Sequence, residues 1–259
     1  MLQQIYYVFT LTYIDLHSLI TLGHEESRNF SPIFYNLGLT RPTSFFAEPS
    51  NASAVLTFLS FSYISILNQV NKVSLLGFIV ASMTLSSAAV LISGLSLLVL
   101  VLFDKTFFKN IYIKIFSFFL FVSSLSYVVL LTVDRIFGNT EYDMISSRTN
   151  IFRYLYEQDW INYFFGNGIL ILKNPIIYSG IEIYNYTFRD SGFFVNLFFS
   201  TGIVGVVFFI FWSKLKIKKM SLLIIFLIIL NSKYDYLQPV FWMLIFCVSI
   251  SSYKIKGYK

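Results

Sequence analysis

The sequence predicts an all-α membrane protein: a single integral membrane domain, residues 1–259, in which about eight spans form a helix bundle and a long outward-facing loop contains an interfacial helix. Hydrophobic residues make up 56% of the chain, charged residues only 12%, and the mean hydropathy is +0.71, well outside the range of soluble domains. Most lysines lie singly or in small groups between apolar runs, as expected on the cytoplasmic side of a polytopic protein.

Apolar runs define the predicted spans. Single spans are predicted at residues 3–22, 52–67, 111–133, 191–212, 221–231 and 237–252, and two more spans lie within residues 73–103. The stretch 73–103 is uncharged for 31 residues, whereas one upright span needs about 20. We therefore expect two short spans with a break near Thr84-Leu85-Ser86-Ser87, which also places the lysines that follow on the same side as Lys72.

The first and seventh spans are the weakest. The seventh is short, and the first carries Asp15 and His17 in its second half. A carboxylate and an imidazole at that depth usually face a bundle interior or the interface, so we expect a local polar pair near the outer surface. Both termini are predicted to be cytoplasmic, and residues 23–51 and 134–190 are predicted to form periplasmic or extracellular loops.

Arginine and lysine are separated along the chain. All six arginines lie in the loops 23–51 and 134–190, while eleven of the thirteen lysines lie in the short segments predicted to face the cytoplasm. Arginine binds phosphate bidentately through a rigid, permanently charged fork, whereas lysine is a flexible point charge. Acids outnumber bases on the outer side, so the arginines should act in local sites rather than as a broad basic surface. This pattern predicts a protein that handles a phosphate-bearing lipid at the outer membrane face.

Several other kinds of site are not expected. The net charge of +6 follows the positive-inside pattern and does not indicate nucleic-acid binding. Cys247 is the single cysteine and lies in the last apolar run, and the two histidines, His17 and His24, are too few for a metal cluster. The sequence therefore predicts no metal site and no cofactor. Ordinary pairing with nearby carboxylates is expected for three arginines: Arg28, Arg135 and Arg189.

The first outer loop ends in a proline-bounded segment directly before the second span. Pro42 and Pro49 restrict the backbone, which predicts a defined, hairpin-like excursion that holds Arg41 and Glu48 near the membrane surface. Two interpretations of Arg41 and Glu48 stay open: they belong to a binding site, or they form a mutual salt bridge.

The second outer loop is 57 residues long, and loops of this length usually serve a function. Ser146-Ser147-Arg148-Thr149-Asn150 offers helix caps, and residues 151–160 carry apolar groups at helical spacing, which predicts an interfacial amphipathic helix that Gly166-Asn167-Gly168 stops. Arg148 would lie in the first turn, where free backbone N–H groups and the helix dipole also favour an anion. The alternative is an ordinary surface helix with Arg148 at the headgroup level.

The same loop ends by delivering a carboxylate, Asp190, to the start of the sixth span. Gly202 and Gly205 follow within that span. Two glycines at this spacing indicate close helix packing.

In order along residues 38–212, these segments resemble motifs of the O-antigen polymerase and O-antigen ligase superfamily of bacterial cell-envelope glycosyltransferases. The stretch from Arg41 to Ser50 is similar to its arginine–glycine–phenylalanine–glutamate–proline loop, with Ser44 where glycine is usual. Thr84-Leu85-Ser86-Ser87 is similar to its threonine- and serine-bearing membrane turn, although the arginine that often follows is absent.

The second half of the resemblance lies in the long loop. Arg148 followed by Ile151 and Phe152 resembles the arginine that opens the large periplasmic loop, and Gly166-Asn167-Gly168 resembles the glycine turn further along it. The stretch from Asp190 to Gly205 resembles the polymerases' loop-to-helix junction, where ligases commonly carry histidine and asparagine. Members of the superfamily usually have several more spans ahead of the arginine–glutamate loop, so we expect a minimal or amino-terminally truncated version.

The resemblance implies a polysaccharide polymerase of the bacterial inner membrane, acting on O-antigen or capsule repeat units. This metal-independent, inverting enzyme would move a growing glycan from undecaprenyl diphosphate to a lipid-linked repeat unit. Arg41 and Arg148, with Arg153 in reserve, would stabilise the leaving diphosphate, and Asp190, or as second choice Glu48, would deprotonate the acceptor hydroxyl. The partners would be the undecaprenyl-diphosphate-linked oligosaccharide, membrane lipid and a chain-length regulator protein.

Two rival functions stay open. An O-antigen ligase acting on lipid A core is the close alternative within the superfamily. A non-enzymatic lipid-glycan flippase or transporter would also handle a diphosphate lipid, but it should place basic groups in a central cavity, and the spans between residues 52 and 133 carry almost no charge.

Overall fold

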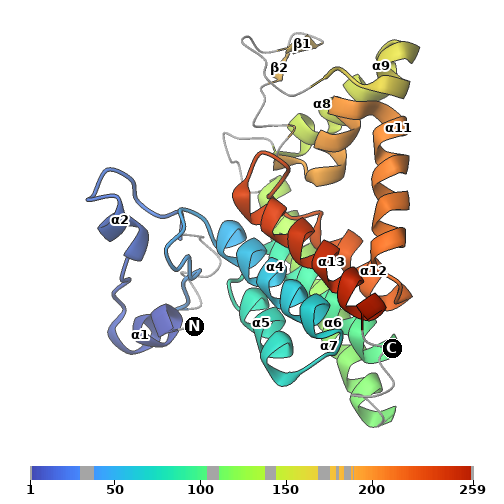
Figure 1. Cartoon of the computed structure of the whole chain (residues 1–259). Helices are drawn as coiled ribbons and strands as arrows, with labels where there is room; N and C mark the ends of the chain where they lie inside the picture. The colour runs from blue at the N-terminus through green and yellow to red at the C-terminus, as the bar shows by residue number, and fades with distance from the viewer. Residues whose placement is uncertain are drawn as a thin grey trace.

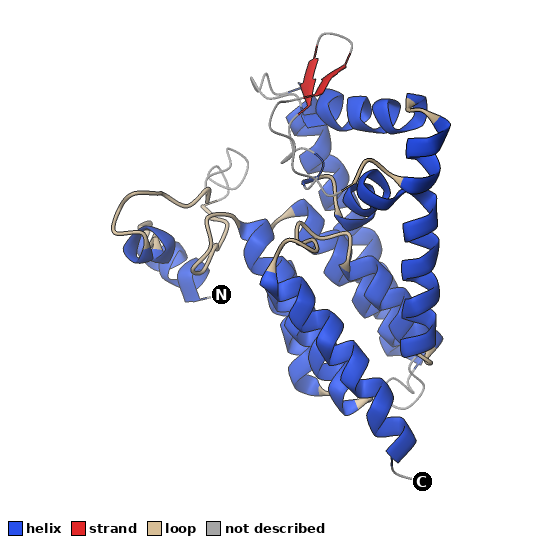
Figure 2. Cartoon of the chain, turned by 45° about the horizontal axis from the view of Figure 1, so that its top comes forward, coloured by secondary structure: helices blue, strands red, loops and turns tan. Residues whose placement is uncertain are grey.

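The computed structural model describes residues 2–29, 38–103, 111–137, 144–168, 176–178, 181–183, 188 and 190–257. These residues are mostly helical, as the sequence predicts (Figure 2). The strands described are β1 (Ile176–Tyr178) and β2 (Ile181–Ile183), which pair antiparallel with Ile176 opposite Ile183. They belong to the segment between the long loop's helices and α11, so the sheet is an excursion from a helical protein.

A helix bundle forms the body of the protein (Figure 1). Its members are α4 (Pro49–Leu67), α5 (Lys72–Ser82), α6 (Ser87–Phe103), α7 (Ile111–Phe137), α11 (Phe193–Lys216), α12 (Met220–Ile229) and α13 (Pro239–Gly257). Helix α4 packs against α5, α12 and α13, and α6 packs against α5, α7 and α12. Aromatic rings fill the core: Phe61 lies 5.7 Å from Phe226, and Phe193 stacks on Phe241 at 5.0 Å.

The predicted break in the uncharged stretch is confirmed. Helix α5 ends at Ser82 and α6 begins at Ser87, and Leu85 between them takes a positive φ of 56°. The two helices pack against each other as a hairpin. Threonine and serine hydroxyls favour such a turn because they bond locally to the backbone, as Thr84 Oγ1 does to the Ala81 carbonyl at 2.8 Å.

Residues 3–22 do not form a single continuous helix, so this part of the prediction is wrong. Helix α1 (Leu2–Thr10) ends where Leu11 takes a φ of 55°, and α2 (Leu16–Ile20) is a separate short helix. Asp15 caps α2 by accepting backbone N–H groups, so the polar residue begins a new helix instead of lying within an old one. Figure 1 shows α1 and α2 standing beside the bundle, joined to it at the start of α4.

The helix of the long loop begins earlier than predicted. Helix α8 (Met144–Glu157) starts at Met144, ahead of the predicted caps at residues 146–150, and a short helix, α9 (Trp160–Phe165), follows it. Gly166 caps α9, so a helix does stop at Gly166-Asn167-Gly168 as predicted, but the predicted single helix is divided in two by the end of α8 at Glu157. The buried residues of α8, Ile151 and Leu155, form a small core with Phe188 and Phe199.

Helix α11 is interrupted at Gly202, which has φ 63° and ψ −167°. The interruption leaves carbonyl groups of the first half without helical partners, and the end of α9 supplies them: Asn167 N donates to Phe199 O at 2.8 Å, and Gly168 N donates to Ser200 O at 3.0 Å. The backbones touch here, because a Cβ on Gly202 would lie 2.3 Å from the Phe164 carbonyl. The predicted close packing is therefore confirmed for Gly202.

Within the described residues, α4 and α11 are long and apolar enough to cross a membrane. Four other apolar helices, α5, α6, α12 and the first part of α13, are shorter. Large apolar side chains of α11, among them Phe208 and Phe211, are exposed. Two of the described helices thus combine the length and the apolar composition of a membrane span, and the arrangement of eight spans remains a prediction.

Substituting Gly202 with alanine should destabilise the protein. The new Cβ would clash with the Phe164 backbone, and φ 63° is a strained conformation for alanine, so we expect the free energy of unfolding to fall by about 2 to 4 kcal/mol. Thermal unfolding of the purified protein in detergent micelles measures this. In the control, Gly23→Ala, φ is 80° but no atom lies within 4 Å, so only the strain of about 1 kcal/mol should appear. Equal losses in the two variants would show that α9 and α11 are not in backbone contact.

Candidate functional site

Three charged residues from distant parts of the chain meet at one end of the bundle. Lys233, in the turn between α12 and α13, places its Nζ 2.5 Å from Glu48 Oε2 and 3.9 Å from Asp190 Oδ1. Glu48 directly precedes α4, and Asp190 lies just before α11. We call this end of the bundle, where α4 and α11 begin and α12 turns into α13, the polar end. The two acids predicted from the sequence therefore lie next to the same lysine.

Both oxygens of the Glu48 carboxylate are engaged. Arg28 Nη1 donates to Oε1 at 2.8 Å, while Lys233 and the Ser50 hydroxyl donate to Oε2. Burial alone would raise the pKa of Glu48, but the hydrogen bonds and charges of Lys233, Ser50 and Arg28 outweigh it and hold the pKa below its ordinary value. Glu48 is therefore an ionised anchor for two cations. The expected pairing of Arg28 with a nearby carboxylate is confirmed, and the salt bridges described for Glu48 are those to Arg28 and Lys233.

Asp190 is the more accessible of the two acids. Its side chain is 54% exposed, and its 3.9 Å contact with Lys233 is too long for a hydrogen bond. Gly192 holds the chain close to the α12–α13 turn: it has φ 106°, and a Cβ there would lie 3.6 Å from the Asn231 carbonyl oxygen. The junction thus presents one carboxylate to the solvent beside a cation.

A buried polar network holds the α12–α13 turn against α11. Asp235 is fully buried and accepts hydrogen bonds from Asn196 Nδ2 at 2.8 Å and from Leu237 N at 2.9 Å. The Tyr236 hydroxyl donates to Asn196 Oδ1 at 3.3 Å and lies 2.6 Å from Ser200 Oγ. Since buried polar groups are stable only when they are satisfied, the network fixes the position of the turn and so of Lys233.

Arg41 lies in the loop between residue 38 and α4, and residues of α1 and of the segment that follows α1 hold this loop. Thr43 is fully buried, and its Oγ1 lies 2.7 Å from the Tyr13 hydroxyl. Ser44 N donates to Gln3 Oε1 at 2.8 Å, and Ser44 itself takes a φ of 55°. The excursion is therefore defined, as its prolines predict, but α1 and the residues after it supply the contacts.

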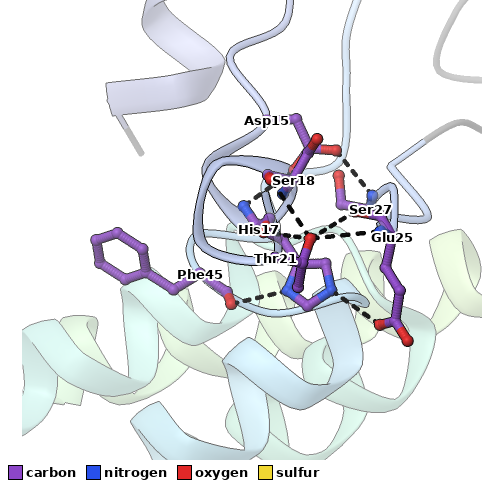
Figure 3. Close-up of polar contacts among 7 residues, drawn as sticks. All are labelled: Asp15, His17, Ser18, Thr21, Glu25, Ser27 and Phe45. Atoms are coloured by element: carbon purple, nitrogen blue, oxygen red, sulfur yellow. Dashed lines mark hydrogen bonds and ion pairs between the residues drawn. The ribbon is translucent and has the colours of Figure 1, made fainter. Parts of the chain in front are cut away.

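Figure 3 shows how α2 joins this loop. The Asp15 carboxylate accepts the backbone N–H groups of His17, Ser18 and Ser27 at 3.0, 3.1 and 2.8 Å. The His17 ring lies 3.2 Å from the Phe45 carbonyl and 3.4 Å from Glu25. Asp15 and His17 are thus connected through the backbone of His17, and the imidazole ties α2 to the loop that carries Arg41 and Glu48.

The arginines of α8 are placed differently from the prediction. Because α8 begins at Met144, Arg148 lies beyond the first turn, so the expected arrangement with free helix N–H groups is wrong; its side chain lies outside the described residues. Arg153 is exposed on the same helix.

In the described part of the chain, Lys233 contacts both Glu48 and Asp190. Glu48 also accepts hydrogen bonds from Arg28 and Ser50. The two predicted acids are brought together on Lys233, and the ion pairs described for them come from Lys233 and, for Glu48, also from Arg28. Arg135 and Arg189 lie outside the residues whose side chains are described.

Two residues of the site, Lys233 and Asn196, were not among those predicted from the sequence. The available signal was the pair of opposite charges, Lys233 and Asp235, in a connector of a few residues between two strongly apolar runs. Nothing in the local sequence links this connector to Glu48. Among the described residues no group of three histidine, cysteine or acidic side chains is placed to hold a metal ion.

Comparison of the chain with protein-family models, with curated proteins and with solved structures found no match.

The contribution of Glu48 to stability should depend on pH. A lowered pKa means that the ionised carboxylate stabilises the folded state fully above its ordinary value of 4.5, and that this stabilisation is lost as the pH falls through the lower value of the folded protein. Glu48→Gln removes the effect. We therefore expect the difference in Tm between the wild type and Glu48→Gln to be largest near neutral pH and to shrink below pH 4.5.

The matched control is Glu26→Gln, which changes an exposed carboxylate of the same loop. Its Tm should differ from that of the wild type by less than the Glu48 variant at neutral pH. A Glu48→Gln difference that is constant between pH 7 and pH 3 would contradict the ion pairs described above.

Proposed function

We propose that the chain is a polysaccharide polymerase of the bacterial inner membrane, which transfers a growing glycan from undecaprenyl diphosphate to a lipid-linked repeat unit at the outer face. The observation that carries the proposal is the meeting of Glu48 and Asp190 on Lys233 at one end of the bundle. Glycosyl transfer without a metal requires a base for the acceptor and fixed cations for the leaving group. Both kinds of group stand at this end.

In the proposed reaction Asp190 is the base. Its exposed carboxylate takes the proton of an acceptor sugar hydroxyl, whose oxygen attacks the anomeric carbon of the growing chain from the face opposite the diphosphate. The new carbon–oxygen bond forms as the bond to the diphosphate oxygen breaks, so the configuration inverts. The lipid diphosphate leaves with the electron pair, and we assign Arg41 and Arg148, with Arg153 in reserve, to the developing negative charge.

Glu48 takes a different part in this scheme. Its two oxygens already accept hydrogen bonds from Arg28, Lys233 and Ser50, so no oxygen is left to take a proton without breaking an ion pair. We therefore propose Asp190 ahead of Glu48 as the base. Glu48 becomes the anchor that keeps two cations at the polar end.

The membrane setting of the proposal has its own support. Helices α4 and α11 are long and apolar enough to span a bilayer, and exposed phenylalanines on α11 suit contact with lipid. The predicted multi-pass topology, in which the lysine-bearing connectors face the cytoplasm, puts the polar end outside. Ser44, at the position where the resembled superfamily carries glycine, takes a positive φ, the conformation that glycine adopts most readily.

A reaction with purified components separates this function from its rivals. Given only undecaprenyl-diphosphate-linked repeat units, a polymerase should produce a ladder of products, while a ligase needs lipid A core as the acceptor and a flippase makes no product. Addition of a chain-length regulator protein would then alter the length distribution of the ladder and not its existence.

The Asp190→Asn variant should lose polymerisation. An amide cannot accept the acceptor's proton, so the rate of ladder formation should fall by about 100-fold or more. Glu48→Gln should retain more activity, because it weakens an anchor and leaves the base in place. The rate is followed by gel separation of labelled products. If Asp190→Asn still polymerises while Glu48→Gln does not, the roles of the two acids are the reverse of those proposed.

Replacement of Arg41 or Arg148 by lysine should lower polymer length and amount in cells. Lysine keeps the charge but loses the two parallel hydrogen bonds to a phosphate, so we expect a decrease of about tenfold or more in the rate. Arg135→Lys is the matched control, since Arg135 belongs to the same outer loop as Arg148 and is expected only to pair with a nearby carboxylate. Wild-type polymer from Arg41→Lys and Arg148→Lys would rule out bidentate recognition of the diphosphate.

A further inference from the structure

Helix α9 carries an apolar face that stays largely uncovered in the described part of the chain. Four of its six residues are large, apolar and exposed: Trp160, Ile161, Phe164 and Phe165. We call these four side chains the aromatic face. Apolar side chains scattered singly over a surface are ordinary, whereas a contiguous apolar group marks a contact with lipid or with another protein.

The rest of α9 is held against α11, as Figure 1 shows. The Tyr163 ring meets the Phe198 ring edge to face at 5.2 Å, and the Phe164 backbone lies against Gly202. Because the contact includes backbone atoms of both helices, it fixes the place of α9 along α11 and leaves the aromatic face exposed.

The position of this contact sets the depth of α9. Gly202 lies inside the apolar helix, and not at its start, Phe193. From Gly202 to Lys216 the helix rises about 21 Å at about 1.5 Å per residue, whereas the hydrocarbon core of a bilayer is about 30 Å thick. With Lys214 and Lys216 at the cytoplasmic surface, as the lysine pattern predicts, α9 is level with the outer leaflet.

The surroundings of the aromatic face are those of a membrane surface. Lipid around α11 would meet the exposed apolar side chains that follow Gly202 within two turns, which are Val204, Val207 and Phe208. Asp159, an exposed acid, directly precedes α9, and no charged residue occurs from Trp160 to Gly168. A charged group at the start of an uncharged, tryptophan-bearing helix suits the level of the headgroups.

Burial distinguishes α9 from α8. The sequence predicts an interfacial helix over residues that α8 and α9 divide between them. In α8, Ile151 and Leu155 are buried in the small core with Phe188 and Phe199. Those apolar residues of α8 are therefore used within the protein, whereas the aromatic face of α9 is free to meet the membrane.

We propose that α9 is a membrane anchor whose aromatic face lies among the lipid chains of the outer leaflet, with Asp159 at the level of the headgroups. The partner is the bilayer itself. A second copy of the chain is the competing occupant, but lipid is already expected on the neighbouring side of α11. The inference goes beyond the proposed glycosyl transfer and does not depend on it.

Quenching of tryptophan fluorescence by brominated phosphatidylcholine tests the anchor in vesicles that contain the full-length protein. The chain has three tryptophans, so Trp212→Phe combined with Trp242→Phe leaves Trp160 as the single reporter. We expect bromines near the headgroup end of the lipid chains to lower the Trp160 emission by about half, and bromines near the chain ends to lower it less, because an interfacial helix lies about 5–10 Å into the boundary between headgroups and chains. Should the single-tryptophan protein not fold, the difference in emission between the wild type and Trp160→Phe gives the same quantity.

Two exposed phenylalanines provide a matched pair of variants. Phe165→Asp puts a carboxylate into the aromatic face, and Phe152→Asp puts one on α8; the two residues are 64% and 58% exposed. A carboxylate is costly among lipid chains, so Phe165→Asp should lower the lipid quenching of Trp160 by about half or more. Phe152→Asp should leave that quenching unchanged. Circular dichroism in micelles checks that both variants are folded.

The proposal is overturned if brominated lipid leaves the emission of Trp160 unchanged, or if Phe152→Asp lowers the quenching as much as Phe165→Asp does. Unchanged emission together with a mass of two copies by light scattering, reduced to one copy by Phe165→Asp, would assign the aromatic face to a second copy instead. The measurement needs no substrate and no turnover. A protein with a quenched Trp160 that makes no polymer would keep the anchor and remove the polymerase function, and a polymerase with an unquenched Trp160 would do the opposite.

Discussion

The structure of the polar end depends on one ammonium group between two carboxylates. Lys233 comes from the turn between α12 and α13, Glu48 from the start of α4 and Asp190 from the start of α11, so a single side chain ties three segments together. A partly buried charge is stable only near opposite charge, and each partner therefore constrains where the others can lie. The Asn196–Asp235 hydrogen bond adds a second, buried connection between the same turn and α11. Together these two contacts determine where the charged side chains of the polar end lie.

A second constraint is the close approach of two backbone segments, around Gly166 and around Gly202, which places α9 against α11. At each of the two glycines a Cβ would lie 2.3–2.4 Å from backbone atoms of the other segment, so no other residue fits without displacement. The interruption of α11 frees carbonyls that Asn167 and Gly168 then satisfy. The long loop is thus attached to the bundle by main-chain hydrogen bonds, and the exposed aromatic residues of α9, such as Trp160 and Phe165, remain on the surface.

The candidate site was only partly predictable. Glu48 and Asp190 could be proposed from their places before two apolar runs, and Arg28 from the abundance of acids around it. Lys233 could not, because its connector is short and its partners lie far away in sequence; only the folded bundle brings them within 4 Å. The position of Arg148 was misjudged for a local reason. Several residues before it also favour helix or cap, so sequence pattern did not determine where α8 begins.

The amino-acid sequence by itself determined the helical class, the apolar runs and the breaks at residues 83–86 and 166–168, since each follows from local composition, turn-forming residues and periodicity. It also indicated which loops carry charge. The tertiary structure decided that α1 and α2 are separate helices, that Glu48 pairs with Arg28 and Lys233, and that Asp235 lies buried against Asn196. Those features depend on contacts between residues that are far apart in the sequence. No local sequence pattern specifies such contacts.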